Sequence, residues 1–276
     1  MDTFRGAVMD LRGGIIHHRS VPIGVAGGEQ AVALAAELAR ELVALAERPL
    51  LGVGVASPGV VSPQGVVLRA PALGWRDVSL QDELTEALGG IPTRIVNDAN
   101  AAALAEHSFG NVEGDLIVVR IGHGVAAGLV LGDTLMLGNH FSAGEIGHVM
   151  IGTDGGRPCA CGRIGCLETW LSIPHIQAEL RSPHAISPAH VLREAGRRLG
   201  IALAPVVGSL NLSQVVLTGI RGTIGDQVVE STRQTLARRI NPDYQALPLV
   251  RLSELGEDNV LKGAAVMVIS AQLGVS

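Results

Sequence analysis

The sequence predicts an α/β protein with two lobes, and three observations support this fold class. Of the 276 residues, 47% are hydrophobic but only 2% are aromatic, so alanine, valine, leucine and glycine must build the core. Segments with strand and helix character alternate along the chain. The pattern of glycine-punctuated strands followed by strand–helix alternation also begins twice, at the N-terminus and again near Asp115. We therefore expect a duplicated α/β unit with a cleft between two lobes.

The first lobe is expected over residues 1–113, as the smaller of the two. Its long helix is indicated by the apolar stripe of alanine, leucine and valine in "GEQAVALAAELARELVALAE". A loop is expected over residues 62–79, before a short helix. The remaining elements are strands over residues 6–9, 15–21, 50–61 and within 91–100, and helices over 29–47, 80–88 and 101–110.

The second lobe is expected over residues 114–276 and opens with three strands within residues 115–139. The first lobe opens with only two, so by this comparison it lacks a leading strand and the glycine turn after it. The last helix of the chain is expected to pack back on the first lobe. The later elements are helices over residues 167–180, 188–203, 225–239 and 259–273, and strands over 213–219 and 248–255.

Composition and charge exclude several classes of protein. The formal net charge is −5 and no cluster of lysine and arginine stands out, so the sequence has no basic footprint for nucleic acid. No apolar run approaches the roughly 20 residues that span a bilayer. The opening "MDTFRGAVMD" has no signal-peptide pattern, and an odd number of cysteines argues against a disulfide framework. We expect a cytoplasmic protein.

All three cysteines of the chain, Cys159, Cys161 and Cys166, lie within eight residues, and His148 precedes them. Cysteine and histidine are the ligands of closed four-coordinate zinc sites, and the turn-forming residues between the cysteines let the chain fold around an ion. Four protein ligands leave no open position, so a structural Zn²⁺ is predicted rather than a catalytic one. The alternative is three ordinary small core residues.

Seven motifs in order resemble the ROK family, which groups bacterial sugar kinases with sugar-responsive transcriptional repressors. They are "SPGVV", "APALGW", "NDANAAALAE", "GHGVAAGLVL", "GEIGH", "CACGRIGCLE" and "VVLTG". The resemblance implies the two-lobed actin/hexokinase-like fold, a duplicated ribonuclease H-like unit, with sugar bound in the cleft between the lobes. It also implies that zinc is bound by His148, Cys159, Cys161 and Cys166.

The resemblance places sugar contacts at Asn97, Asp98, Glu145, His148 and Glu168. Carboxylates and amides suit this task because each sugar hydroxyl both donates and accepts a hydrogen bond. Other interpretations stay open: Asp98 can cap the following helix through its side chain, and Glu145 and Glu168 can be solvated loop charges. In the kinases of the family, the aspartate that matches Asp98 is the general base for phosphoryl transfer.

Several positions depart from the kinase pattern. The family kinases open with a strand that ends in an Asp-x-Gly-Gly-Thr loop, which this sequence does not contain. In the second phosphate turn, Gly122 and Gly124 flank His123 where the kinases usually carry threonine, so these glycines form at most a weak, degenerate cofactor turn or a plain hairpin. The stretch "LTGI" lacks the usual glycine pair, and Ala72 replaces a frequent asparagine. We do not expect ATP or Mg²⁺ to bind.

The sequence therefore favours a sugar-binding module over an enzyme. The first hypothesis is the effector domain of a ROK-type transcriptional regulator. It binds a small-molecule sugar or derivative, forms a homodimer or homotetramer, and contacts DNA only through a helix-turn-helix outside this chain, with no membrane partner. The alternative hypothesis is an ATP-dependent hexose or N-acylhexosamine kinase with Asp98 as its catalytic base. A third interpretation is a structural relic that binds neither ligand.

Overall fold

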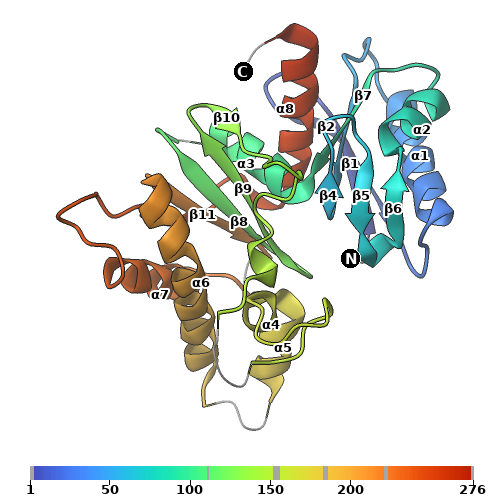
Figure 1. The fold of residues 1–276 in the computed structure, drawn as a ribbon. Coiled ribbons are helices and arrows are strands. Elements are labelled where there is room, and N and C mark those ends of the chain that lie inside the picture. The colour runs from blue at the N-terminus through green and yellow to red at the C-terminus, as the bar shows by residue number, and fades with distance from the viewer. Residues whose placement is uncertain (1–2, 111, 152–155, 183–185, 221–222, 275–276) are drawn as a thin grey trace. The chain divides into compact units, whose positions relative to one another are not determined.

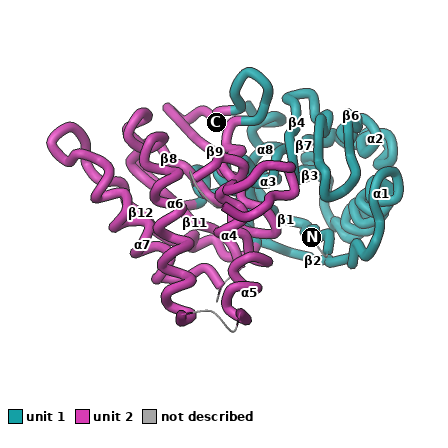
Figure 2. The backbone as a smooth tube through the Cα atoms, turned by 60° about the horizontal axis from the view of Figure 1, so that its bottom comes forward, with its two compact units in different colours: residues 1–109, 137–142, 258–276 teal, residues 110–136, 143–257 magenta. Residues whose placement is uncertain are grey.

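The structure is a computed structural model that describes residues 3–110, 112–151, 156–182, 186–220 and 223–274 (Figure 1). The chain forms two compact units, shown in different colours in Figure 2. Unit 1 comprises Met1–Phe109, Leu137–Ser142 and Asp258–Ser276, and unit 2 comprises Gly110–Met136 and Ala143–Glu257. Both units combine strands with helices, which confirms the predicted α/β class.

Unit 2 is built on a five-stranded sheet in the order β10-β9-β8-β11-β12. The first three strands of the unit form consecutive antiparallel hairpins, while β11 and β12 continue the sheet in parallel beside β8. Most residues of β8 and β11 are buried, which explains their near-continuous apolar sequences. The strands are β8 (Leu116–Ile121), β9 (Val125–Leu131), β10 (Thr134–Leu135), β11 (Gln214–Gly219) and β12 (Leu249–Leu252).

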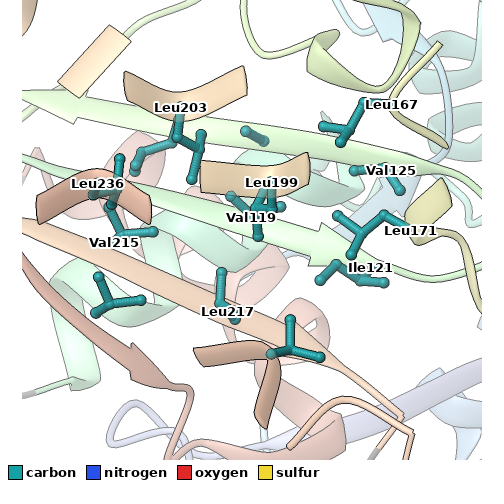
Figure 3. Close-up of a cluster of buried hydrophobic side chains, with 14 of the residues drawn as sticks. Val119, Ile121, Val125, Leu167, Leu171, Leu199, Leu203, Val215, Leu217 and Leu236 are labelled. Atoms are coloured by element: carbon teal, nitrogen blue, oxygen red, sulfur yellow. The ribbon is translucent and has the colours of Figure 1, made fainter. Parts of the chain in front are cut away.

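Helices cover this sheet and bury one hydrophobic core with it. Figure 3 shows side chains from β8 and β11, such as Val119 and Leu217, against Leu199 and Leu203 of α6 and Leu236 of α7. Burial of such aliphatic side chains contributes roughly 1.5–3 kcal/mol each. The helices of unit 2 are α4 (Glu168–Leu171), α5 (Ile173–Arg181), α6 (Pro188–Leu210) and α7 (Asp226–Ala237).

The single helix predicted over residues 167–180 is wrong, because the structure has two helices there. The backbone of Ser172 is extended, with ψ at 148°, and it separates α4 from α5. Pro174 explains the break, since a proline inside a helix lacks the N–H donor and its ring collides with the carbonyl four residues earlier. As the second residue of α5, the proline is accommodated in the first turn.

The described residues of unit 1 form three small sheets. β1 (Thr3–Met9) pairs with β2 (Ile15–Pro22) in an antiparallel hairpin, and β3 (Val53–Ser57) pairs in parallel with β7 (Thr93–Asn97). The third sheet is antiparallel and joins the short strands β4 (Val60–Val61), β5 (Val67–Ala70) and β6 (Trp75–Val78).

The loop predicted over residues 62–79 is therefore wrong, since β5 and β6 lie within it. Each of these strands has only four residues, too few for a clear alternating pattern. They meet in register because Gly74 takes a left-handed conformation after the short turn Pro71–Leu73. Trp75 is buried in this sheet, and its indole N–H donates to the Gly28 carbonyl at 2.8 Å.

Four α-helices complete the described part of unit 1, and the last one comes from the C-terminal end of the chain. Helix α8 packs on α3 and on β3. Glycines make both contacts possible, because a Cβ on Gly263 would overlap the carbonyl oxygen of Ala101, and one on Gly54 would overlap that of Ala264. The helices are α1 (Glu29–Ala44), α2 (Leu80–Ala87), α3 (Asp98–Phe109) and α8 (Asn259–Leu273). No helix among the described residues combines the length and apolar character that crossing a bilayer requires.

The two units differ at the centre of their sheets. In unit 2, β8 lies between β9 and β11 and bonds to both. In unit 1, by chain order and strand direction, β1 and β2 correspond to β9 and β10, and β3 and β7 to β11 and β12. Among the described residues of unit 1, no strand pairs with both β1 and β3 as β8 does with their counterparts. One edge of β1 and one edge of β3 thus lack ladder hydrogen bonds within the described chain.

This difference predicts uneven protection of backbone amides in hydrogen–deuterium exchange. We expect the amides of β3 that point away from β7 to exchange at least roughly 100-fold faster than those of β8, because only β8 is paired on both sides. Exchange measured by mass spectrometry on overlapping peptides checks this, with β11 as a second fully paired control. Equal protection of β3 and β8 would contradict the description of β3 as an open edge.

Candidate functional site

Residues 144–148 lie along strand β9, and two glycines allow this close approach. The Ala127 N–H donates to the Gly144 carbonyl at 2.7 Å. A Cβ on Gly144 would overlap the carbonyl oxygen of Ala127, and one on Gly147 would overlap that of Val125. The spacing of "GEIGH" thus has a packing reason: its glycines contact the strand, while Glu145 and His148 stand before and at the end of the short 3-10 helix Ile146–His148.

The cysteine loop is a tight hairpin whose backbone is closed by short hydrogen bonds. The Cys159 N–H donates to the Arg163 carbonyl at 2.8 Å, and the Gly162 N–H donates to the Cys159 carbonyl at 2.9 Å. Gly162 has φ of 87°, a left-handed conformation that favours glycine. This turn explains why glycine stands immediately after Cys161.

A second set of backbone contacts brings Cys166 beside the histidine segment. Met150 and Cys166 form an isolated antiparallel bridge, and the Leu167 N–H donates to the Val149 carbonyl at 2.9 Å. The Cys166 Sγ lies 3.6 Å from the carbonyl oxygen of His148. The histidine and the last cysteine, 18 residues apart in sequence, are therefore neighbours in space.

The hairpin of the cysteine loop and the bridge between Met150 and Cys166 bring four potential metal ligands together. One nitrogen of His148 and the sulfurs of Cys159, Cys161 and Cys166 all lie within 4.8 Å of one another. Cys159 Sγ is 3.6 Å from His148 Nδ1, and Cys161 Sγ is 3.6 Å from Cys166 Sγ. The three cysteines are free, since a disulfide requires a sulfur–sulfur distance near 2.05 Å. The group can hold one metal ion.

Glu168 borders this group as the first residue of α4. Its Oε1 lies 3.2 Å from Cys159 Sγ and 3.7 Å from His148 Nδ1. A Cβ on Gly124, in the turn between β8 and β9, would lie 3.2 Å from Glu168 Oε2. Within unit 2 the structure thus brings Glu168, the four potential ligands and the glycine turn together.

The three thiols differ in acidity because their surroundings differ. A hydrogen bond from the Arg163 backbone, with further help from the Cys159 side chain, lowers the pKa of the exposed Cys161 thiol to about 7. Burial raises the pKa of Cys159 to about 12, and the hydrogen bond to Glu168 acts in the same direction. Burial also raises the pKa of Cys166. Cys161 is therefore the thiol that ionises most easily.

Asn97 and Asp98 lie in unit 1, at the junction of β7 and α3, and both are buried. Asn97, rather than Asp98, caps the helix. Its Oδ1 accepts from the N–H groups of Ala99 at 2.9 Å and Asn100 at 3.0 Å. The capping role considered for Asp98 is thus filled by the residue before it, because α3 begins at Asp98 itself. Asn97 Nδ2 also donates to the Gly59 carbonyl at 2.7 Å, which leaves one amide hydrogen for another partner.

The turn formed by Gly122 and Gly124 is largely engaged in its own hydrogen bonds. The Gly122 N–H donates to the Gly124 carbonyl at 2.9 Å, and the Gly122 carbonyl accepts from the Ile173 N–H at 2.8 Å. A phosphate loop needs backbone N–H groups that point at the ligand. In this structure the Gly122 N–H closes the hairpin instead.

One contact beside the site has no sequence signal. The Arg198 guanidinium lies 4.2 Å from the centre of the Trp170 ring and that of Arg157 lies 5.2 Å from it, distances typical of cation–π contacts. Arg157 also pairs with Glu179 at 2.7 Å. Because Trp170 follows Glu168 by two residues, these contacts support the start of α4 from outside the cysteine group. Arg157, Trp170 and Arg198 lie on separate segments of the chain, so no periodic sequence pattern predicts that they meet.

A ROK family model matches residues 1–271. A xylose repressor of Caldicellulosiruptor bescii is 28% identical over 258 residues, which are 81% of this chain and 64% of the repressor. The chain thus spans less than two thirds of the length of that relative.

Solved structures of two classes are also similar. A ROK family transcriptional regulator, described as a homologue of the E. coli MLC protein, matches 99% of this chain and 76% of its own with a TM-score of 0.85 at 25% identity. A ROK hexokinase from Thermus thermophilus matches 99% of this chain and 97% of its own with a TM-score of 0.81 at 26% identity. These matches confirm the predicted actin/hexokinase-like fold class. The chain belongs to the ROK family.

Proposed function

We propose that this chain is the sugar-binding effector domain of a ROK-family transcriptional regulator, with a structural zinc ion that orders part of the sugar pocket. The observation that carries the proposal is the position of Glu168, whose carboxylate lies 3.2 Å from Cys159 Sγ and 3.7 Å from His148 Nδ1. A metal bound by the group would fix the segments that carry Glu145 and Glu168. Relatives of both classes bear names that refer to sugars, which supports this choice of ligand.

Zinc is the metal that suits this donor set. Three thiolates and one imidazole are typical of structural zinc sites. Sulfurs about 2.3 Å from a tetrahedral centre lie about 3.8 Å from each other, and the Cys161–Cys166 distance of 3.6 Å is close to that value. Four protein ligands close the coordination shell. The role of the ion is therefore structural, with no position left for an activated water.

The sugar contacts of the proposal are Asn97, Asp98, Glu145, His148 and Glu168. Carboxylates accept from sugar hydroxyls, and the remaining amide hydrogen of Asn97 can donate to one. Gly122 has its N–H engaged in the hairpin, which argues against a phosphate at that turn. This combination, with polar groups for a sugar and an engaged glycine turn, favours a sensor over a kinase.

In the intact regulator, sugar binding would shift the equilibrium between two conformations of the protein. It does so only to the extent that the sugar binds one conformation more tightly. DNA is contacted through a helix-turn-helix outside this chain, and the regulator acts as a homodimer or homotetramer. These features are proposed for the whole regulator. The xylose repressor that is similar to this chain is longer than the matched part, which covers 64% of it.

The alternative is an ATP-dependent hexose or N-acylhexosamine kinase, and one observation favours it. Since Asn97 supplies the cap of α3, the buried carboxylate of Asp98 is not needed for that task. A general base must lie within hydrogen-bond reach of the hydroxyl it deprotonates, and Asp98 would have this role.

The zinc proposal predicts a pH-dependent order of thiol reactivity in metal-free protein. Cys161 should react first with iodoacetamide at pH 7, because a pKa of about 7 leaves about half of it as thiolate. Cys159, with a pKa of about 12, should react slowly, and lowering the pH below 7 should slow Cys161 as it protonates. Peptide mass spectrometry identifies the modified cysteine.

Zinc-loaded protein is the control, in which all three cysteines should be protected and metal analysis should find one zinc per chain. Zinc content near zero after reconstitution, or equal alkylation with and without zinc, would contradict the proposal.

The sugar proposal predicts that Glu168→Gln weakens sugar binding. We expect calorimetry with xylose and with glucose to show saturable binding of at least one of them without ATP, at least tenfold weaker in the variant, a loss of about 1.4 kcal/mol. The substitution keeps the shape of the side chain and removes its charge. Glu230→Gln, on the surface of α7, is the matched control and should bind as the wild type does.

An ATP analogue with Mg²⁺ separates the two functions in the same experiment. The effector proposal predicts no saturable binding of the analogue at millimolar concentration. Binding of the analogue together with sugar phosphorylation that Asp98→Asn abolishes would establish the kinase instead. Absence of binding to any sugar tested would count against both.

A further inference from the structure

We propose that the groove between α6 and α7 is a second ligand site, which binds the phosphoryl group of a small phosphorylated molecule. The groove lies within unit 2 and forms an open hollow of about 240 Å³. It is separate from the cysteine group and does not depend on the proposed function. Its lining residues are His190, Arg193, Glu194 and Arg197 of α6 and Ser231, Gln234, Thr235 and Arg238 of α7.

The base of the groove is held by close contact between the two helices. A Cβ on Gly196 would lie 2.5 Å from the Val228 carbonyl oxygen, so the backbones meet without side chains between them. The hydroxyl groups of Ser231 and Thr232 donate to carbonyl oxygens of α6, at 2.6 Å and 3.1 Å. The lining side chains therefore project from a fixed pair of backbones, in rows spaced three and four residues apart.

Two arginines supply uncompensated positive charge. Arg193 and Arg238 are exposed, and within the described part of the chain neither guanidinium forms an ion pair or hydrogen bond. They come from opposite sides of the groove. Guanidinium groups bind phosphate through paired N–H donors, which makes arginine a preferred residue for this anion.

Glu194 is the one carboxylate among the described residues that line the groove, and its charge is offset by arginine partners. Glu194 pairs with Arg197 through two bonds of 2.7 Å and accepts a third, also of 2.7 Å, from Arg198, which lies outside the lining. The hydrogen bonds from Arg197 lower the pKa of Glu194, so it remains ionised and bound to its partners. With Glu194 offset in this way, the two unpaired arginines leave the groove positive.

Size and charge favour a small ligand over a nucleic acid. The pocket is large enough for a phosphoryl group with part of the molecule that carries it. The chain as a whole has a formal charge of −5, which opposes binding to the extended negative backbone of DNA or RNA. The Nε2 of Gln234 donates to Glu230 Oε1 at 2.7 Å. The side-chain oxygen of Gln234 therefore remains to accept a hydrogen bond from a hydroxyl group of the ligand.

The test is calorimetric titration of the full chain with inorganic phosphate and with pyrophosphate at fixed ionic strength. We expect saturable binding that the double variant Arg193→Ala/Arg238→Ala weakens at least tenfold. The matched control is Arg48→Ala/Arg76→Ala, which removes the same charge from two exposed arginines that do not line the groove. It should change the affinity less than twofold, and thermal melting by circular dichroism should show that both variants fold.

Each outcome decides the proposal. No saturable binding of either anion to the wild type would overturn it, as would equal weakening by both double variants, which would indicate a general charge effect. Displacement of pyrophosphate by a short DNA duplex would show a nucleic-acid surface instead of a small-molecule site. Because Glu168→Gln should leave phosphate binding unchanged, failure here is distinguishable from failure of the sugar proposal.

Discussion

The close approach of residues 144–148 to strand β9 is the contact on which the rest of the site depends. Gly144 and Gly147 face carbonyl oxygens of that strand, and a side chain at either position would push the segment away. His148 is placed by this contact, and the backbone bonds between residues 149–151 and 165–167 bring Cys166 to it. The cysteine group, Glu168 and the start of α4 all follow from the position of this one segment.

A metal would add what the polypeptide alone cannot supply. The thiols of Cys159 and Cys166 are buried, and this loss of hydration raises their pKa values. A cation offsets this cost by stabilising the thiolates. Glu168 would then stand beside a fixed centre, and the cation–π contacts of Trp170, two residues further on, would hold the same helix. Sugar recognition needs such order, because epimers differ by the position of one hydroxyl.

Much of the fold and of the candidate metal site could be predicted from the sequence, because the sequence patterns that indicate them are local. The metal ligands share one short segment, the strands of unit 2 have continuous apolar sequences, and the fold class follows from alternation. The errors have physical causes: β5 and β6 are too short to show a period, and Pro174 divides a helix whose apolar pattern continues through it. The bond from Asn97 to the Gly59 carbonyl and the groove between α6 and α7 depend on distant segments meeting, which no spacing along the chain reveals. The contacts of Arg157 and Arg198 with the Trp170 ring also join separate segments of the chain.

If a structural metal orders the sugar site, sugar binding must depend on that metal, so the decisive experiment measures sugar binding before and after metal removal. Calorimetry with xylose and glucose would compare zinc-loaded protein, chelator-treated protein, and treated protein with one equivalent of Zn²⁺ restored. We expect binding to be lost in the second sample and recovered in the third, while circular dichroism shows that the sheet of unit 2 persists. Equal sugar affinity with and without zinc would contradict it.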